Sequence, residues 1–510
     1  MNHLHGRRAA GVVSVAIVGA LALAGCSGGG SADPSASADK ETLTLAMSQD
    51  IEGFDPRIQP AYQNWPADAV WDRLVKCDAS AQLEEDIAES WEMLPDNTGI
   101  TAHLRDGLTF SDGSVLDAED IKAAYEYMGQ PESSRAADYE DLIITIDDPL
   151  TITLEWPEPQ ATVRTLICDI PVTSADYLAS GEYLDEPLGS GPYVIDMDKT
   201  TVGSEYVYTK NADHWNADHY PYENLVVKVL EDESAMVSAL KTGQVAGGLV
   251  TDQARAEAEA SGLEIKDFQG QTVRILLTDH NGEVYPALAD VRVRQAMNMV
   301  FDKEAIAESI YLGNAEPTAQ YFRQGTEAYI EDLEDPYPYD VEAAKALMAE
   351  AGYADGFDIE LPSLDSNLAH IMPYVIEQLG QINIRATEKV LTGATAIDDL
   401  LSGTYPVILF ELGNLGDSTF QIYIEDYNEG WWNVSHQPDE FVDSSYEKLA
   451  TASAEESATI QQEINQYTID NAWQVPLVYK GTHFAYDADL VSVPTDSDIE
   501  ALAPKLRDFQ

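Results

Sequence analysis

Residues able to do chemistry are scattered through this chain, and few of them stand at the spacings that a reaction or a metal requires. The sequence contains no His-Glu-x-x-His metal motif, no phosphate-binding P-loop and no EF-hand calcium loop. His214 and His219 miss the i,i+4 spacing that places two ligands on one face of a helix. His436 is a somewhat better single candidate for a metal ligand. The pattern predicts no catalytic site, no metal and no cofactor.

The charge of the chain is strongly one-sided, and this excludes several classes of partner. Its 510 residues include 90 acidic and 28 basic side chains, which gives a formal net charge of −62. Such a surface repels phosphate backbones, so nucleic-acid binding is excluded. It also repels anionic lipid, so any attachment to a membrane must be covalent or by insertion. Hydrophobic residues make up 45% of the chain, which is enough for a large folded core.

The amino terminus predicts the compartment. Two arginines precede an almost wholly apolar stretch, residues 9–23, which is short for a membrane span and fits a signal peptide. The stretch leads into Leu-Ala-Gly-Cys26, which resembles the bacterial lipobox. We therefore expect residues 1–25 to be a lipoprotein signal peptide, Cys26 to be acylated, and residues 26–40 to be a flexible tether at the outer face of the cell membrane. The alternative is an ordinary secretory signal with an incidental cysteine.

Two cysteines remain after lipidation, Cys77 and Cys168. Outside the cytoplasm, two leftover cysteines more often form a disulfide than stay reduced. Closing so long a loop lowers the entropy of the unfolded chain and thereby stabilises the fold. We expect Cys77 and Cys168 to pair, and the alternative is two buried free thiols.

From residue 41 onward, short strands alternate with helices, which is typical of a mixed α/β fold. Alternating or continuous apolar residues predict strands at 42–45, 151–154, 206–208 and 224–230. Asp117 and Asp340 each precede a run with helical spacing, so each predicts the start of a helix. Further helices are expected near 233–242, 290–312, 368–380 and 455–472.

Read in order, several short blocks resemble the extracellular solute-binding proteins, family 5, of peptide- and nickel-type ABC importers. Each block is weak alone, and their common order along the chain carries the resemblance. The blocks are 83–91 (LEEDIAESW), 103–113 (HLRDGLTFSDG), 189–193 (GSGPY), 211–215 (NADHW), 235–243, 290–296 (DVRVRQA) and 343–356.

The resemblance implies an α/β fold of two lobes that close like a clamshell around a ligand, of the type II periplasmic-binding-protein class with an extra subdomain in the first lobe (large, cluster C-like). The chain is expected to work as a monomer with an ABC permease and its ATPase. The implied parts are lobe one at 41–272 plus 480–510, with a subdomain inserted at about 60–185, and lobe two at 273–479. Strand-like crossovers at 272–276 and 475–479 suit a hinge.

Peptide binders in this family hold the α-ammonium group of the ligand with an aspartate in a D-Y/N-x-D-P-x-x-F segment. The matching stretch here, 410–420, lacks the Asp-Pro, and the expected acid falls near Gly413 or Asn414. The remaining candidates for an acidic anchor are Asp417 and Glu411. This departure keeps open a neutral ligand such as an oligosaccharide, because an ammonium group buried without a carboxylate is costly.

Aromatic and basic residues supply the other candidates for ligand contact. Trp431 and Trp432 are adjacent on an extended segment and therefore face opposite ways, so one is expected to stack on ligand while the other packs inside. In lobe one the candidates are Asn64 and Trp65, and in lobe two Tyr321 and Arg323, the latter for a ligand carboxylate. For each of these residues the alternative is an ordinary place in the core, on the surface or in a salt bridge.

Together these observations predict a lipid-anchored, non-enzymatic substrate-binding subunit of an ABC importer that captures oligopeptides between two lobes. One alternative keeps the scaffold and changes the ligand to an oligosaccharide or another neutral solute. From other classes, the alternatives are a secreted hydrolase or a surface sensor.

Overall fold

The computed structural model describes most of residues 41–510, and these residues form one unit. The described ranges are 41–51, 53–57, 65–78, 81–133, 135–168, 170–181, 187–364, 368–392, 396–413, 417–494 and 503–510. The predicted signal peptide, the tether with Cys26, and the candidate ligand residues Asn64 and Asn414 lie outside the described residues.

The largest sheet combines strands that are far apart in the sequence. Its strands run in the order β16, β12, β17, β11, β1, β10, β9, β8, and β13 adds to β17. β1 is parallel to both β10 and β11, whereas the other pairs are antiparallel. The bounds are β1 Thr42–Met47, β8 Tyr193–Ile195, β9 Glu205–Lys210, β10 Asn224–Val229, β11 Gly247–Val250, β12 Glu264–Leu277, β13 Ala315–Pro317, β16 Val407–Gly413 and β17 Gln474–Tyr486.

These strands form where the sequence alternates between polar and apolar residues. In β1, Leu43 and Leu45 are buried, while the alternating Thr42 and Thr44 are half-buried. In β9, Tyr206 and Tyr208 are fully buried on the same face. The predicted strands at 42–45, 151–154, 206–208 and 224–230 are all confirmed.

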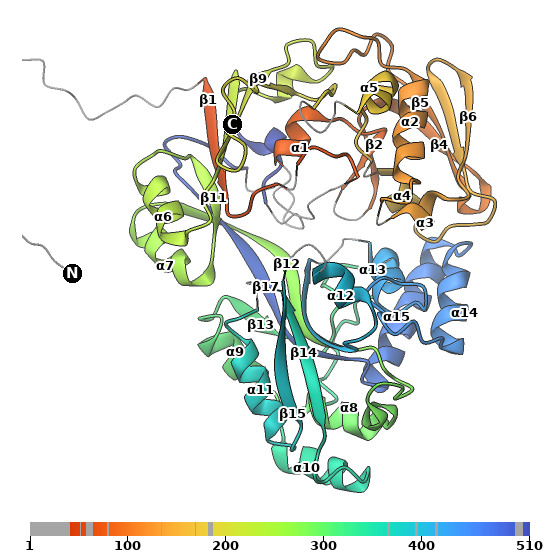
Figure 1. The fold of residues 1–510 in the computed structure, drawn as a ribbon, viewed down its shortest axis with the longest axis vertical. Coiled ribbons are helices and arrows are strands. Elements are labelled where there is room, and N and C mark those ends of the chain that lie inside the picture. Colours follow the sequence, from red (N-terminus) through yellow and green to blue (C-terminus); the bar gives the residue numbers. More distant parts are fainter. Residues whose placement is uncertain are drawn as a thin grey trace, which may run out of the picture. The chain divides into compact units, whose positions relative to one another are not determined.

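Two long strands, β12 and β17, connect two groups of elements (Figure 1). The first group contains the elements that precede β12 in the sequence, and the second contains those between β12 and β17. The two strands pair from Glu264 opposite Tyr486 to Leu276 opposite Gln474. One end of β17 packs into a core shared with β1 and β9, and the other end packs into a core shared with α8 (Val291–Asn298) and α11 (Met372–Gly380). The predicted lobe boundaries fall within these two strands and stay a prediction.

A second sheet belongs to the first group of elements, within the predicted inserted subdomain. Its order is β4, β5, β7, β6, and it shares a core with α2 and α4. The predicted helix start at Asp117 is confirmed, because Asp117 and Asp120 form a capping box and the helix ends at Gly129. The bounds are α1 Trp65–Val70, β2 Val75–Cys77, β3 Leu83–Glu85, β4 Ala88–Met93, β5 Gly99–Leu104, α2 Ala118–Met128, α3 Ala136–Tyr139, β6 Ile143–Asp148, β7 Thr151–Glu155, α4 Val163–Cys168 and α5 Ala175–Ser180.

A disulfide joins Cys77 at the end of β2 to Cys168 at the end of α4. The two Cα atoms are 5.5 Å apart, and 91 residues of sequence separate them. The bond therefore ties the first short hairpin of the subdomain to one of its last helices.

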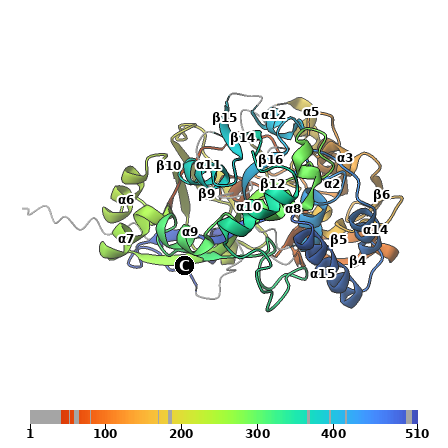
Figure 2. The ribbon, with the colours of Figure 1, turned by 90° about the horizontal axis from the view of Figure 1, so that it is seen from below.

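The helices that the sequence predicts are present, although the segment 290–312 contains two helices, α8 and α9, and α7, α12, α13 and α14 were not predicted. Asp340 accepts hydrogen bonds from two backbone N–H groups at the start of α10, and the helices expected near 233–242, 290–312, 368–380 and 455–472 are present. α14 and α15 lie side by side (Figure 2). No helix in the described part of the chain is long and apolar enough to span a membrane. The bounds are α6 Glu233–Lys241, α7 Asp252–Ala260, α9 Lys303–Ser309, α10 Val341–Glu350, β14 Asp358–Leu364, β15 Arg385–Leu391, α12 Ala396–Leu401, α13 Ser418–Glu425, α14 Glu440–Leu449 and α15 Ala454–Asp470.

Candidate ligand-binding site

A cavity of about 450 Å³ lies beside the paired strands β12 and β17; we call it the Glu411 cavity. Its wall combines residues that follow β1, β10 and β11 with residues of β12, β16 and β17. The lining residues are Ser48, Gln49, Leu230, Glu231, Glu233, Met236, Leu249, Val250, Thr251, Asp252, Gln253, Gln271, His370, Glu411, Lys480, Gly481, Thr482 and His483.

The sheet topology explains why polar side chains gather at this cavity. Because β1 runs parallel to β10 and β11, the carboxyl ends of these three strands share one edge of the sheet. Ser48 follows β1, Glu231 lies just beyond β10, and Asp252 begins the helix after β11. The crevice outside the carboxyl ends of strands is where α/β sheets commonly bind ligands.

Glu411 and Lys480 bring opposite charges to the cavity from neighbouring parts of the same sheet. Glu411 lies on β16 and Lys480 on β17, with β12 between the two strands. The Lys480 Nζ is 2.9 Å from the Glu411 Oε1, and the Glu411 side chain is only 8% exposed. Glu411 is thus a nearly buried carboxylate with one oxygen held by an ammonium group.

The second oxygen of this carboxylate is the unusual feature of the site. Glu411 Oε2 is buried and has no hydrogen-bond partner among the described residues. No other buried side-chain oxygen or nitrogen of the described cavity wall is in this state. Leaving a buried acceptor unsatisfied destabilises a protein by about 1–3 kcal/mol, and more for a charged group. The cavity wall therefore contains a carboxylate with an unsatisfied oxygen, which a ligand donor could satisfy if it reached this atom.

The other charged groups of the wall make the cavity acidic, and several already have partners. Asp252 Oδ1 lies 3.0 Å from His483 Nε2, and Asp267 Oδ1 lies 2.6 Å from the other ring nitrogen. Glu233 accepts a hydrogen bond from the Thr251 backbone N–H. Four acidic residues line the cavity against one lysine, so its field favours a cationic group.

Asp417, the other predicted anchor, serves a different purpose. It is the N-cap of α13, where its Oδ1 accepts from the backbone N–H groups of Thr419, at 2.9 Å, and Phe420, at 3.2 Å. Its Oδ2 accepts a hydrogen bond from the Thr165 hydroxyl at 2.7 Å. Burial raises the pKa of Asp417. Because the cap and Thr165 occupy this carboxylate and it does not line the Glu411 cavity, the expectation of a ligand contact at Asp417 is corrected.

Trp65 lies in the core, which corrects its expected place on a ligand surface. Its side chain is 2% exposed, and its indole N–H donates to the Pro504 carbonyl at 2.7 Å. The ring packs edge-on against Phe484 and Phe509. Trp65 is buried because residues near the end of the chain fold back over α1 and enclose its ring.

Tyr321 and Arg323 are also buried, at 1% and 4% exposure, and neither lines the Glu411 cavity. The Tyr321 hydroxyl donates to Asp426, and the guanidinium of Arg274 lies 5.2 Å from the ring centre. Tyr321 is therefore a core residue, and the expected ligand contact of Arg323 stays a prediction.

Trp431 and Trp432 pack against aromatic neighbours within the second group of elements. Trp432 lies 4.3 Å from Phe410, centre to centre, and Trp431 makes edge contacts with Phe420 and Tyr423. The two rings point to different neighbours, as adjacent residues of an extended segment must. Neither tryptophan lines the Glu411 cavity, so the expected stacking on ligand is not found there.

A buried charge cluster, which the sequence analysis did not identify, contacts Tyr321. Arg274 and Glu425 form an ion pair at 2.5 Å, with both side chains fully buried. Asp426, next to Glu425, is 2% exposed. Burial raises the pKa of Asp426 to about 8, with a further contribution from the charge of Glu425. This cluster is part of the core and does not line the cavity.

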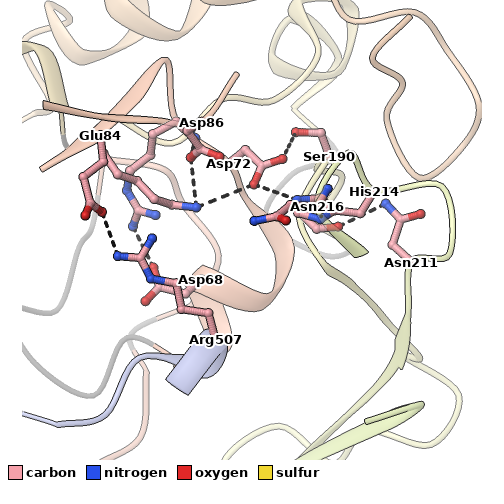
Figure 3. A network of polar contacts seen from close by, with 12 residues as sticks. Asp68, Asp72, Glu84, Asp86, Ser190, Asn211, His214, Asn216 and Arg507 are labelled. Atoms are coloured by element: carbon pink, nitrogen blue, oxygen red, sulfur yellow. Dashed lines mark hydrogen bonds and ion pairs between the residues drawn. The ribbon is translucent and has the colours of Figure 1, made fainter. Parts of the chain in front are cut away.

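A second polar network, in the first group of elements, accounts for His214 (Figure 3). Asp72 lies 3.2 Å from His214 Nε2 and accepts a hydrogen bond from Ser190 at 3.0 Å. Lys76 Nζ is 3.0 Å from Asp86 and 3.8 Å from Asp72. Burial and the nearby Asp72 raise the pKa of Asp86 to about 6. His214 is therefore a partner of a buried carboxylate.

The described residues contain no group of three or more histidine, cysteine or acidic side chains able to hold a metal ion. His436 accordingly has no such group around it; its Nδ1 lies 2.9 Å from the Asn428 carbonyl oxygen.

Lys480, Glu231, Glu233 and Asp252 are charged wall residues that the sequence analysis missed. Glu231 follows the end of the strand predicted at 224–230, and that position was the available signal for it. Asp252 follows β11, a strand that the sequence analysis did not predict. Lys480 has no local signal, because only the pairing of β17 with β12 brings it near Glu411.

Comparison with known proteins places the chain in a family. The model for bacterial extracellular solute-binding proteins, family 5, matches residues 82–447. Heme-binding protein A of Haemophilus influenzae is 28% identical over 378 residues, which cover 67% of this chain and 68% of the relative. Glutathione-binding protein GsiB of Salmonella paratyphi A is 24% identical over 357 residues, which cover 68% of each chain.

Among solved structures, the fold is similar to that of the ABC transporter-associated periplasmic binding protein DppA from Helicobacter pylori in complex with the peptide STSA. The TM-score is 0.78 at 18% identity, and the match covers 92% of this chain and 97% of that chain. The two-lobed α/β fold expected from the sequence is thereby confirmed. Because the family model spans well over half of the sequence, the chain belongs to the bacterial extracellular solute-binding proteins, family 5.

Proposed function

We propose that this protein is the substrate-binding subunit of an ABC importer and that it captures oligopeptides by their terminal ammonium group, with Glu411 as the counter-charge. The observation that carries the proposal is the buried, unpartnered Oε2 of Glu411 in the wall of an acidic cavity. Binding changes no bond of the ligand, since the function of a solute-binding protein is capture and delivery.

The position of Glu411 suits this role. In peptide binders of the family the anchoring acid falls near the position of Gly413 or Asn414, two or three residues beyond Glu411. Side chains two residues apart on a strand point to the same face of the sheet. A carboxylate at 411 therefore faces the same side as one at 413, displaced by about 7 Å along the strand.

The electrostatics of the cavity favour an ammonium group over a neutral solute. Lys480 occupies only Oε1 of Glu411, so Oε2 remains available as an acceptor. A ligand ammonium group supplies both the donor and the charge, and a charge-assisted hydrogen bond is about twice as strong as a neutral one. A sugar hydroxyl would supply the donor alone.

The relatives give this proposal a chemical context. One is named for glutathione and one solved neighbour holds a peptide, while another relative is named for heme. The family thus serves ligands of several kinds, and the choice of a peptide here rests on Glu411.

We also propose that the mature protein begins at an acylated Cys26 and is held at the outer face of the cell membrane. The support is the apolar stretch that ends at this cysteine and the tether that follows it. Intact-mass measurement of the protein extracted from host membranes tests this: acyl groups are expected on Cys26, and a mature chain without them would refute the anchor.

The peptide proposal is tested by calorimetric titration of tetrapeptides with free or acetylated amino termini. We expect the free peptides to bind at least tenfold more tightly, and Glu411→Gln to abolish this preference. Glu264→Gln is the matched control, because this exposed acid lies on β12 of the same sheet but outside the cavity wall.

Two results would contradict the proposal. Equal affinity for free and acetylated peptides would remove Glu411 as an ammonium anchor. Binding of oligosaccharides with no binding of any peptide would favour the neutral-solute alternative instead.

A further inference from the structure

A second cavity, of about 410 Å³, lies between the predicted inserted subdomain and helices α13 and α14; we call it the tyrosine cavity. One wall comes from residues 137–166, and the other from residues 423–451. It shares no lining residue with the Glu411 cavity. Nothing in the proposed peptide anchor accounts for it.

Aromatic rings form much of the wall. Tyr423, Tyr427 and Tyr446 form a cluster in which each ring contacts the other two, with ring centres 4.4 to 6.1 Å apart. Trp156 contributes a fourth ring from the opposite wall. Such π-faces carry partial negative charge and attract cations, most strongly when water is excluded.

Carboxylates surround these rings. Asp141, Glu158, Glu429 and Glu447 line the cavity, and none of them forms an ion pair with a described basic residue. The fifth acid, Asp138, is already bound by Arg135 and by the Tyr423 hydroxyl. The residues described as lining the cavity include no lysine or arginine. The combined field therefore favours a positively charged occupant.

The arrangement does not suit a bare metal ion. A metal requires several oxygen ligands within a short distance of one point, and the described residues hold no such group. Carboxylates spread around clustered rings suit a large, weakly hydrated cation, which contacts π-faces while its charge is balanced at longer range.

We infer that the tyrosine cavity is a second ligand site, which takes an organic cation: an alkylguanidinium or alkylammonium group. The rings hold the flat or alkyl part of the cation, and the carboxylates balance its charge. Because the cavity lies apart from Glu411, its occupant binds independently of the peptide's terminal ammonium group.

Ligand-observed NMR titration of the mature protein with agmatine, at fixed ionic strength, tests this site. Agmatine is expected to bind saturably, whereas the uncharged N-butylurea is not. Glu447→Gln and Tyr427→Leu are each expected to raise the dissociation constant for agmatine at least fivefold. Glu447 is exposed, so its substitution keeps the test valid if the Tyr427 variant fails to fold.

Two control variants separate this site from general charge and from the Glu411 cavity. Glu440→Gln removes the same charge from an exposed position of the same helix, α14, and is expected to leave agmatine binding unchanged. In Glu411→Gln, agmatine is expected to retain saturable binding, because the tyrosine cavity does not include Glu411. The inference is overturned if agmatine does not bind, if Glu440→Gln weakens binding as much as Glu447→Gln, or if Glu411→Gln abolishes it.

Discussion

At the scale of single residues, two buried carboxyl groups, those of Glu411 and Asp426, have different surroundings and different consequences. Glu411 lines a cavity, with one oxygen bound to a lysine and the other buried without a partner among the described residues. Asp426 is buried in the core, where it accepts a hydrogen bond from the Tyr321 hydroxyl beside the Arg274–Glu425 pair. The first suits ligand binding, and the second affects the pH dependence of stability.

The raised pKa of Asp426 predicts a loss of stability as the pH rises from about 4 to about 8. Because the folded-state pKa, about 8, exceeds that of an unfolded aspartate, the folded chain binds the proton more tightly. The stabilisation is complete below pH ~4 and is lost as pH rises through 8, with a slope of at most about 1.4 kcal/mol per pH unit.

Asp426→Asn should remove this contribution, because the amide is neutral at every pH. We expect its free energy of unfolding, measured by denaturant titration at pH 6, 7.5 and 9, to fall less steeply with pH than that of the unmodified protein. Asp198→Asn, at an exposed position, is the control and should leave the slope unchanged. Identical slopes for Asp426→Asn and the unmodified protein would show that Asp426 is ionised in the fold.

At the scale of elements, helix α13 shows that a candidate ligand residue, Asp417, is instead the N-cap of a helix. Asp417 is followed by Ser418, Thr419 and Phe420, a sequence that reads as an N-cap and the first turn of a helix. The sequence therefore contained a signal for an N-cap at Asp417, whereas the resemblance to the family's peptide-binding segment predicted a ligand contact there. The capped carboxylate also accepts from Thr165 of α4, so it links elements that are far apart in the chain.

Asp417→Ala should lower the free energy of unfolding by about 1–2 kcal/mol, since the α13 cap is lost. Asp417→Asn, which can still cap, should lower it much less. Both variants should retain the preference for free over acetylated amino termini, measured by the same calorimetric titration. Loss of that preference in Asp417→Asn would return Asp417 to the list of ligand anchors.

At the scale of the whole molecule, the sequence predicted the architecture well because its signals are local and repeated. Three kinds of signal are each contained in a short stretch of sequence. They are the alternation of polar and apolar residues in strands, the helix caps at Asp117 and Asp340, and the individual family blocks. The contacts of the site are not local. Trp65 is enclosed by residues near position 504, and Lys480 meets Glu411 only through the sheet order. Residue type therefore identified aromatic and acidic candidates, while only the fold decides which of them lines a cavity.

The large negative charge acts at this scale too. Most of the 90 acidic side chains are a solvated surface, yet the Glu411 cavity and the tyrosine cavity are both lined by acids in excess of bases. An acidic protein with acidic cavities is suited to attract cationic ends of ligands.

The most direct measurement is a crystal structure of the protein with a bound tetrapeptide that carries a free amino terminus. We expect the peptide's ammonium nitrogen within hydrogen-bond distance of Glu411 Oε2, with Lys480 still bound to Glu411 Oε1. A peptide bound with its amino terminus elsewhere, and Glu411 facing only water and Lys480, would contradict it.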